Sequence, residues 1–376
     1  MKPYVIVAGD FVTTGGMDAA NHALAMGLAQ RGREVHVVAH RAADDLLARP
    51  EVTFHRVPRP MRSHRLGMPL LDHVGRRLAR AIARRGAHVV ANGGSCAAGD
   101  VVWLHYVHAA YPADDSGLRT LLPLGPRRFR ADELRAVRRA RLVIANSART
   151  ADDAVRLLGA RPERVRTAYY GADADRFRPP SPEERAAARA ALGWDDDRPA
   201  LAFVGALGDR RKGFDTLFSA FAELCRDASW DARLAVAGTG AELPAWRARA
   251  ADAGLADRIH FLGFQLDVRR LLWAADAFVA PTRYEAYGLA VQEALCCALP
   301  AIVSAAAGVA ERIPRSLADL LVRDPDDATE LADVLRAWDR QRGAYASAAR
   351  DASAALRRRT WSDMAAEMMA AIEGDG

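Results

Sequence analysis

Two glutamates, Glu285 and Glu293, stand eight positions apart in the segment of this sequence with the clearest potential for chemistry. An apolar run predicts a strand before them, Glu285 falls in the following loop, and a helix is expected to open near Gly288. Free N–H groups at a helix N-terminus attract phosphate, and a glycine lets the phosphate come close. Glu293 can accept hydrogen bonds from two vicinal hydroxyls, as on a ribose, and Glu285 can reach a sugar. The alternative is a solvated loop residue and a solvated helix face.

A second candidate is the basic loop that follows the strand expected at 200–204. Arg210, Arg211 and Lys212 come directly before Gly213 and a predicted helix. Three cations at a helix N-terminus oppose the helix macrodipole, and a bound anion would relieve that conflict. Only two of the 53 basic residues are lysines, so the presence of Lys212 suggests that a compact ammonium is wanted there. The alternative is a solvated charge cluster.

Two further loops lie in the first half of the chain. Gly15 and Gly16 join a predicted strand to a helix, but their surroundings match neither the dinucleotide fingerprint nor a Walker A loop. A simple turn is the alternative to a site of phosphate approach. His105 is the last residue of the strand expected at 101–105, and His108 lies three residues beyond it. We prefer His108 as the active-site histidine because it lies further past the strand end, whereas His105 also suits a core or strand-end position.

The elements that must position these residues alternate between short apolar runs and amphipathic helical patterns, which indicates parallel sheets covered on both faces. The expected strands are 4–8, 34–39, 52–56, 87–91, 101–105, 141–145 and 164–168, followed by 200–204, 233–237, 258–261, 276–280, 300–303 and 319–322. The expected helices are 18–31, 72–85, 132–139 and 148–158, followed by 213–226, 242–253, 267–274, 288–297 and 327–340.

The composition changes between residues 171 and 199, where prolines and acidic residues indicate a linker. Within it, Ser181, Pro182 and Glu184 have the capping pattern of a helix start. The expected domains are an N-terminal domain (1–172), a linker with the first helix of the second domain (173–199), a C-terminal domain (200–355) and a helical region that packs on or near the domain junction (356–376). In that last region one helical face carries Trp361, Met364, Met368 and Ile372.

Length and composition restrict the possible classes of protein. The 376 residues suffice for two α/β domains, and 51% are apolar, as in soluble globular proteins. A net charge of +6 favours anionic partners, but no run of five or six basic residues occurs, so nucleic acid is not expected. No leader-like segment and no apolar stretch long enough to span a membrane is found, so we expect a cytoplasmic protein.

No metal site is expected. The four cysteines form no CxxC pair, and no histidines cluster with the spacing of metal ligands. Two DxD patterns, at Asp173/Asp175 and at Asp195/Asp197, both fall in the predicted linker, and we interpret them as linker residues.

An arginine-rich stretch over residues 59–85 interleaves basic and apolar side chains. Such a segment can rest on an anionic membrane, which would place the protein peripherally at the inner face of the membrane and point to a lipid or lipid-linked acceptor. The alternative, which we favour, is an ordinary surface helix with an arginine-rich face.

The segment around Glu285 and Glu293 resembles the E-x7-E region of the family 4 retaining glycosyltransferases. Further matches, spread over nearly the whole chain, lie at 143–147, at 170–179 and at the glycine turn 238–240. The resemblance implies an α/β protein with the GT-B fold, in which two Rossmann-like domains face each other across a deep cleft. It also implies transfer of a hexose-type sugar, with retained anomeric configuration and without a metal or other cofactor. The donor would be a UDP-, GDP- or dTDP-sugar, and the hydroxyl acceptor a glycan, a lipid-linked glycan or a small natural product.

The resemblance also implies roles for individual residues. Glu293 would bind the donor ribose, Glu285 would position the donor sugar, and Lys212 would contact the diphosphate. The remaining implied contacts are the backbone of Ala286, Tyr287, Gly288 and Leu289 to phosphate and sugar, Gly15, Gly16, Arg211, Gly240 and Phe264 to the donor, and His108 to the transferred sugar. This chain departs from the family at Ala206, where an arginine is usual, and Arg210 or Arg211 is the candidate substitute.

Two other functions stay open at this point. An epimerase or hydrolase acting on sugar nucleotides with the same fold would need an added acid–base pair, which we do not find. A non-catalytic sugar-nucleotide-binding subunit would be expected to lose catalytic residues, yet Glu285, Glu293 and Lys212 are all present.

Overall fold

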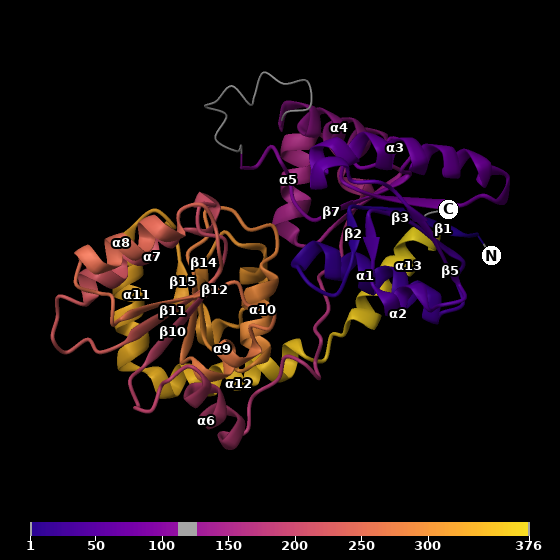
Figure 1. Cartoon of the computed structure of the whole chain (residues 1–376). Helices are drawn as coiled ribbons and strands as arrows, with labels where there is room; N and C mark the ends of the chain where they lie inside the picture. Colours follow the sequence, from indigo (N-terminus) through magenta and orange to yellow (C-terminus); the bar gives the residue numbers. More distant parts are fainter. Residues whose placement is uncertain (1, 112–125, 375–376) are drawn as a thin grey trace. The chain divides into compact units, whose positions relative to one another are not determined.

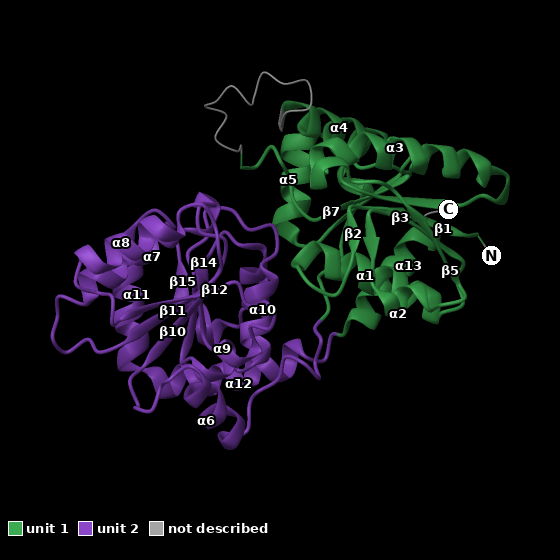
Figure 2. Cartoon of the chain, in the orientation of Figure 1, with its two compact units in different colours: residues 1–171, 360–376 green, residues 172–359 purple. Residues whose placement is uncertain are grey.

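The computed structural model describes residues 2–111 and 126–374. The chain forms two compact units (Figure 2), of which the first combines residues 1–171 with 360–376 and the second spans 172–359. The backbone therefore passes from one unit to the other twice. The two passages lie beside each other, because the N–H of Ala172 donates to the carbonyl of Arg359 at 2.8 Å.

The first unit is built on a parallel sheet with the strand order β5-β3-β1-β6-β7-β8-β9 (Figure 1). Every residue of the central strand β1 is buried, as expected for a parallel strand covered on both faces. The strands are β1 (Tyr4–Val7), β3 (Val35–Ala39), β5 (Val52–Arg56), β6 (His88–Asn92), β7 (Val101–Leu104), β8 (Leu142–Ala145) and β9 (Val165–Thr167), and two short strands, β2 (Asp10–Phe11) and β4 (Arg41–Ala42), pair with each other.

Helices cover both faces of this sheet. The helices α1 (Gly16–Gln30) and α13 (Trp361–Gly374) pack against each other, and α3 (His64–Ala81) and α4 (Pro126–Arg139) lie together on the other side of the sheet (Figure 1). The contact of α1 with α13 is close: a Cβ atom on Gly27 would lie 2.4 Å from the Cβ of Ala365. The remaining helices of the unit are α2 (Asp44–Leu47) and α5 (Ala148–Leu158).

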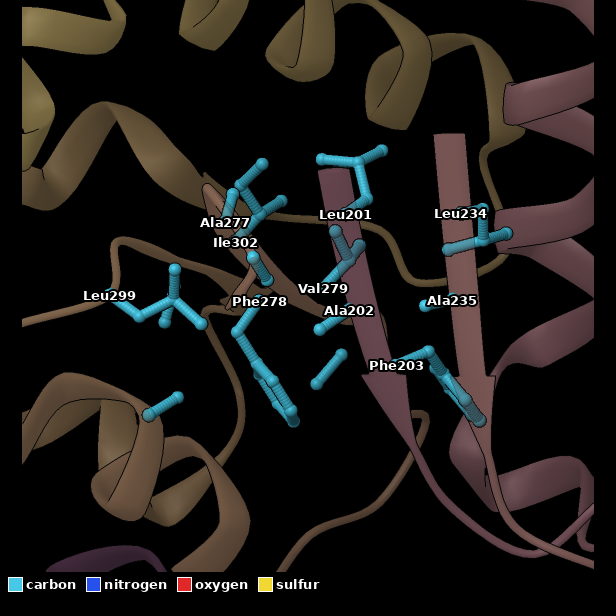
Figure 3. Close-up of a cluster of buried hydrophobic side chains, with 14 of the residues drawn as sticks. Leu201, Ala202, Phe203, Leu234, Ala235, Ala277, Phe278, Val279, Leu299 and Ile302 are labelled. Carbon is cyan, nitrogen blue, oxygen red and sulfur yellow. The ribbon is translucent and has the colours of Figure 1, made fainter. Parts of the chain in front are cut away.

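The second unit repeats this plan with the strand order β12-β11-β10-β13-β14-β15. Its strands are β10 (Ala200–Val204), β11 (Arg233–Ala237), β12 (Ile259–Gly263), β13 (Ala277–Ala280), β14 (Ala301–Ser304) and β15 (Leu321–Val322). The helices are α6 (Pro182–Ala191), α7 (Phe214–Leu224), α8 (Leu243–Asp252), α9 (Arg269–Ala274), α10 (Leu289–Cys296), α11 (Ala328–Arg340) and α12 (Arg342–Leu356). Figure 3 shows side chains of β10, β11, β13 and β14 gathered in one apolar cluster, including Leu201, Leu234 and Phe278.

In each unit the strand order reverses beside the first strand of the sheet. The chain builds outward from β10 to β11 and β12, and then returns to place β13 on the other side of β10. In the first unit the corresponding neighbours are β1 and β6. Loops that leave such a pair run in opposite directions and open a crevice at the carboxyl ends of the strands, which is where doubly wound sheets bind ligands.

The predicted strands are confirmed to within three residues at their ends, and the predicted pattern of helices is largely confirmed. Three helix predictions need correction. The helix expected at 72–85 begins earlier, at His64, because Pro69 is tolerated inside it, and it ends at Ala81 before a short 3₁₀ turn. The helix expected at 132–139 begins at Pro126. Helix α12 was not predicted, because its buried face consists mostly of alanine and serine, which give little contrast in hydropathy.

The region expected to be a linker contains the predicted helix start. The Ser181 hydroxyl accepts from the N–H of Glu184, and the Glu184 carboxylate accepts from the N–H of Ser181, which completes a capping box. The apolar face expected on the final helix buries Met364, Met368 and Ile372. This helix packs within the first unit against α1.

Among the described residues, none of the helices is both long and apolar enough to cross a bilayer. Within the same residues, no group of three or more histidine, cysteine, aspartate or glutamate side chains is arranged to hold a metal ion.

Candidate active site

Lys212 and Glu285 meet at the reversal point of the second sheet. Lys212 lies in the loop that leaves β10, and Glu285 lies in the loop that leaves β13. The Lys212 Nζ atom is 2.6 Å from Glu285 Oε2, and about a quarter of each side chain is exposed. The fold thus brings together an ammonium and a carboxylate that are 73 residues apart in the sequence, at the edge where a doubly wound sheet binds its ligand.

Backbone contacts join these two loops. The N–H of Arg283 donates to the carbonyl of Arg211 at 2.8 Å. Gly213 has a φ of 68°, and a Cβ atom there would lie 1.8 Å from the carbonyl oxygen of Pro281, so only glycine allows the approach. The loops are therefore fixed relative to each other by the main chain as well as by the ion pair.

The Arg283 side chain reinforces the same junction, and no motif in the sequence predicts this role. Its guanidinium is largely buried and donates to the Asp215 carboxylate at 2.8 and 2.9 Å, to Asp326 at 2.6 Å and to the carbonyl of Arg210 at 2.6 Å. Hydrogen bonds to Asp215 hold the pKa of Arg283 above its usual value. Because its partners lie far apart in the sequence, spacing alone could not reveal this role.

The other two cations of the basic loop also lie near acids. Arg211 pairs with Asp209, and Arg210 lies 3.9 Å from Asp215. The three cations also form a 3₁₀ turn of their own, and α7 begins only after Gly213. The unfavourable charge expected at this helix N-terminus is therefore partly offset by carboxylates of the chain itself.

A cavity of about 430 Å³ borders Ala206, the position where the resembling family has an arginine. Arg210 and Arg249 both line it, and Arg249 lies over the Trp246 ring at 4.7 Å from its centroid. Two guanidinium groups therefore border the same cavity as Ala206. Arg249 was not a candidate from the sequence, because it belongs to α8.

The loop from Glu285 to Gly288 is held by hydrogen bonds that its backbone carbonyls accept. The backbone carbonyl of Glu285 accepts from the N–H of Gly308 at 3.0 Å, and the backbone carbonyl of Tyr287 accepts from the N–H of Val309 at 2.6 Å. Gly288 has a φ of 111° and caps α10, and a Cβ atom on it would lie 2.9 Å from Val309. The N–H groups of Gly288 and Leu289 donate to no acceptor in the described chain. They are the donors that a helix N-terminus can offer to an anion.

Glu293 lies in the second turn of α10, as predicted. Burial raises the pKa of its carboxyl group to about 8, and the cation of Arg176 offsets this only partly. No hydrogen bond to this carboxyl group occurs among the described residues. Glu293 is partly buried, and a carboxyl group with a raised pKa and without hydrogen-bond partners marks a functional-site candidate.

The glycine turn after β11 extends the sheet edge next to these loops. Gly238 and Gly240 pass very close to the loop after β10, since Cβ atoms on them would lie 1.8 Å from the carbonyl oxygen of Gly205 and 1.6 Å from that of Leu207. The chain after β12 presents Phe264, whose side chain is 72% exposed. Gly240 thus shapes the edge through its backbone, and Phe264 offers an aromatic surface beside it.

In the first unit, Gly15 and Gly16 stand at the start of α1, where Gly15 has a φ of 85° and no side chain caps the helix. Burial raises the pKa of Asp18, in the first turn, to about 6, and the nearby Asp10 carboxylate adds to the effect. These glycines belong to a different unit from Lys212, Glu285 and Glu293.

The two candidate histidines differ in their surroundings. His105 is bonded to the Tyr170 hydroxyl and lies 3.3 Å from Asn92 Oδ1, and burial lowers its pKa to about 3, so the ring is neutral. His108 is about half exposed, and its Nδ1 lies 2.9 Å from the buried carboxylate of Glu133. Glu133 also accepts from the backbone N–H of His108 at 3.0 Å, so it orients the ring. This partner was not anticipated, because it lies 25 residues further along the chain.

Solved structures share this architecture over the full chain. WaaG, a glycosyltransferase involved in lipopolysaccharide biosynthesis, aligns with a TM-score of 0.79 at 21% identity over 99% of this chain and 100% of its own. HepE of Anabaena, solved in complex with UDP-glucose, aligns with a TM-score of 0.76 at 19% identity over 100% of both chains. The two Rossmann-like units are the GT-B fold, as predicted.

Sequence comparison is more specific than the fold. The model for "Glycosyltransferase Family 4" matches residues 14–176, and the model for "Glycosyl transferases group 1" matches residues 198–338. The chain belongs to the family 4-type glycosyltransferases.

Curated relatives agree with this assignment. The D-inositol 3-phosphate glycosyltransferase of Saccharomonospora viridis is 34% identical over 62% of this chain and 55% of its own length. The lipopolysaccharide core biosynthesis mannosyltransferase LpsB of Rhizobium meliloti is 35% identical over 48% of this chain and 52% of its own. The chain spans about half the length of these curated relatives.

Proposed function

We propose that the protein transfers a hexose-type sugar from a nucleoside-diphosphate sugar to a hydroxyl acceptor, with retention of anomeric configuration and without a metal ion. The observation that carries this proposal is the arrangement at the reversal point of the second sheet. There the Lys212–Glu285 ion pair lies beside the N-terminus of α10, and the same helix presents the unpartnered carboxyl group of Glu293. Cation, amides and carboxyl groups match the phosphates and hydroxyls of such a donor.

In the proposed reaction, the bond between the anomeric carbon and the diphosphate oxygen breaks, and a bond to the acceptor oxygen forms. Negative charge grows on the departing diphosphate, where the Lys212 ammonium and the N–H groups of Gly288 and Leu289 would stabilise it. The acceptor proton passes to the leaving phosphate. Arg210 and Arg211 are the further candidates for a diphosphate contact from the same loop.

Glu285 acts in this proposal as a positioning residue for the sugar. Its carboxylate already accepts a hydrogen bond from the Lys212 ammonium at 2.6 Å, which fixes its position at the mouth of the loop. It can therefore accept hydrogen bonds from sugar hydroxyls while keeping the ammonium in place. His108 in the first unit is assigned a contact with the transferred sugar, and Glu133 is the residue that orients it.

Glu293 binds the donor ribose in this proposal, and its raised pKa has a measurable consequence. In the free protein the group is protonated below a pH of about 8. Two ribose hydroxyls that donate to it favour the ionised form. Donor binding at pH 7 should therefore release close to one proton, and donor affinity should rise with pH until the group is ionised in the free protein.

The relatives guide the choice of substrates to try. HepE was solved with UDP-glucose, which supports a uridine nucleotide as the first donor to test. The curated relatives are named for an inositol phosphate acceptor and for a lipopolysaccharide core, so polyhydroxylated acceptors with and without lipid are the first to try. A cytoplasmic location, with peripheral contact to the inner face of a membrane, is part of the same proposal.

The test begins with binding of UDP, GDP, dTDP and their sugars, measured by thermal shift and titration calorimetry. We expect one base to raise the melting temperature, and we expect Glu293→Ala to weaken that binding at least tenfold. Donor turnover is then followed with candidate acceptors, and NMR of the product reports the anomeric configuration. If no nucleotide binds, or if the donor is epimerised or hydrolysed equally fast without an acceptor, the proposal is wrong.

A further inference from the structure

A second cavity, of about 400 Å³, lies between α3 and α4 in the first unit. Its volume is within the range of small-molecule sites, roughly 300–1,000 Å³. Figure 1 shows the two helices on the same side of the sheet. The cavity is lined by five arginines, namely Arg65 and Arg76 from α3 and Arg128, Arg135 and Arg139 from α4. No residue of this cavity belongs to the candidate active site described above.

Helical spacing explains why these arginines share one cavity. Arg65 and Arg76 are eleven positions apart on α3, which is close to three full turns. Arg128, Arg135 and Arg139 follow each other on α4 at intervals of seven and four, so they also form one stripe. Each helix thus turns a basic stripe toward the other.

Acids neutralise only part of this charge. Asp72 lies 2.9 Å from Arg76, and Asp132 lies 3.6 Å from Arg128 and also pairs with Arg135. Asp72 additionally accepts from the backbone N–H of Ala97 at 2.8 Å. Five guanidinium groups therefore share two carboxylates around the cavity.

Two of the arginines have no acid partner among the described residues. Arg65 and Arg139 make no ion pair or hydrogen bond with any residue in the described ranges. In addition, the buried Nε atom of Arg76 has no hydrogen-bond acceptor there. A pocket with donors in excess and few acceptors is suited to an anionic ligand rather than to a neutral one.

The loop after β6 contacts both helices that border the cavity. The floor includes Gly94 and Ala97, from the loop after β6. A Cβ atom on Gly94 would lie 2.7 Å from the backbone N of Glu133, so glycine allows this loop to support α4 directly. The loop thereby fixes the spacing between the helices that carry the arginines.

We infer that this pocket binds a phosphate group carried by an organic molecule. The planar guanidinium forks of arginine match the oxygens of phosphate, and several of them converge here. Met68 and Phe129 supply an apolar wall for the organic part. Such a phosphate can come from a soluble phosphate monoester or from a phospholipid headgroup. A neighbouring cavity along α3, lined by His73, Arg77 and Arg80, continues the basic surface. The inference does not depend on the proposed sugar transfer.

The test compares two double variants of the full chain that lose the same charge. Arg65→Gln/Arg139→Gln removes the two unpaired arginines of the pocket. Arg84→Gln/Arg127→Gln removes two exposed arginines near the same helices that do not line the cavity. One arm titrates glycerol 3-phosphate by calorimetry, and the other measures co-sedimentation with vesicles of phosphatidylglycerol in phosphatidylcholine.

We expect the pocket variant to lose at least tenfold in affinity in one arm, and the control variant to change by less than twofold. The arm that responds identifies the source of the phosphate. Equal losses in both variants would mean a general electrostatic attraction and would overturn the inference, as would the absence of binding in both arms. Should the pocket variant not fold, hydrogen exchange on the unmodified protein decides: the ligand must protect segments 65–76 and 128–139 selectively.

Discussion

The points at which the strand order reverses have the same topology in the two sheets, but different side chains lie there. In the second unit, the loops that leave β10 and β13 meet through the ion pair of Lys212 with Glu285. In the first unit, neutral groups join the chain beside β1 and β6: the Asn92 amide donates to Asn21 Oδ1 at 2.9 Å, and the Ser95 hydroxyl donates to the Val7 carbonyl at 2.7 Å. The Asp10 carboxylate, in the chain after β1, pairs instead with Arg41 and Arg59. Strand order therefore fixes where a crevice opens, and the side chains decide what can bind there.

The two units also differ in how they treat a buried titratable group near this edge. In the first unit, burial lowers the pKa of His105 to about 3, and the neutral ring has hydrogen-bond partners. In the second unit, burial raises the pKa of Glu293 to about 8, and its carboxyl group has none among the described residues. A neutral group whose hydrogen bonds are all made is typical of a protein core, whereas an acid without hydrogen-bond partners is typical of a ligand-binding site.

The largest effect is expected from removing the Lys212 cation at the reversal point of the second unit. Lys212→Met should lower turnover of the donor by roughly 100- to 1,000-fold, because the charge on the leaving diphosphate would lose its nearest stabilising group. Turnover and donor affinity are measured together on the donor found by the nucleotide screen. Arg270→Met, which removes an exposed cation of the same unit, is the control and should change turnover by less than twofold. Equal effects of the two substitutions would contradict the contrast between the reversal points.

An intermediate effect is expected from crowding the junction of the two loops. Gly213 and Gly32 have nearly the same φ, 68° and 69°, but only Gly213 faces a backbone atom, at 1.8 Å, whereas nothing lies near Gly32. Gly32→Ala should cost about 1 kcal/mol of unfolding free energy through backbone strain alone. Gly213→Ala should cost about 3 kcal/mol and displace the basic loop. Urea denaturation measures both, and similar costs would show that the loops are not tightly joined.

The smallest effect is expected on the free energy of unfolding when the Glu293 carboxyl group is replaced by an amide, and this effect depends on pH. Its pKa is raised in the folded protein from 4.5 to about 8, so the stability that the protonated group contributes is present below pH 4.5 and is lost as the pH rises through 8. Glu293→Gln should therefore gain stability over the unmodified protein between pH 5 and pH 9, by on the order of 2 kcal/mol. Thermal melts at both pH values measure this, with the exposed Glu163→Gln as control. A gain that is independent of pH would argue against the buried acid.

Much of the fold could be predicted from the sequence, because buried parallel strands form short apolar runs with helical patterns between them. Short or weakly amphipathic elements such as β2 and α12 could not, since their residues give no periodic contrast. For the site, the spacing of Glu285, Glu293 and Gly288 indicated one loop and one helix end. The sequence could not show that Lys212 would meet Glu285, or that Arg283 would tie their loops together, because those contacts depend on how distant segments pack.

The position of α13 sets the order in which the chain can fold during its synthesis. The first unit remains incomplete until residues 361–374 have left the ribosome, because Met364, Met368 and Ile372 fill its core and the Tyr4 hydroxyl bonds to Glu373 at 2.8 Å. The second unit, residues 172–359, is continuous and complete before that moment. The first unit is therefore begun before the second unit but completed after it, so the face of α1 that α13 covers stays without this partner while the second unit is translated.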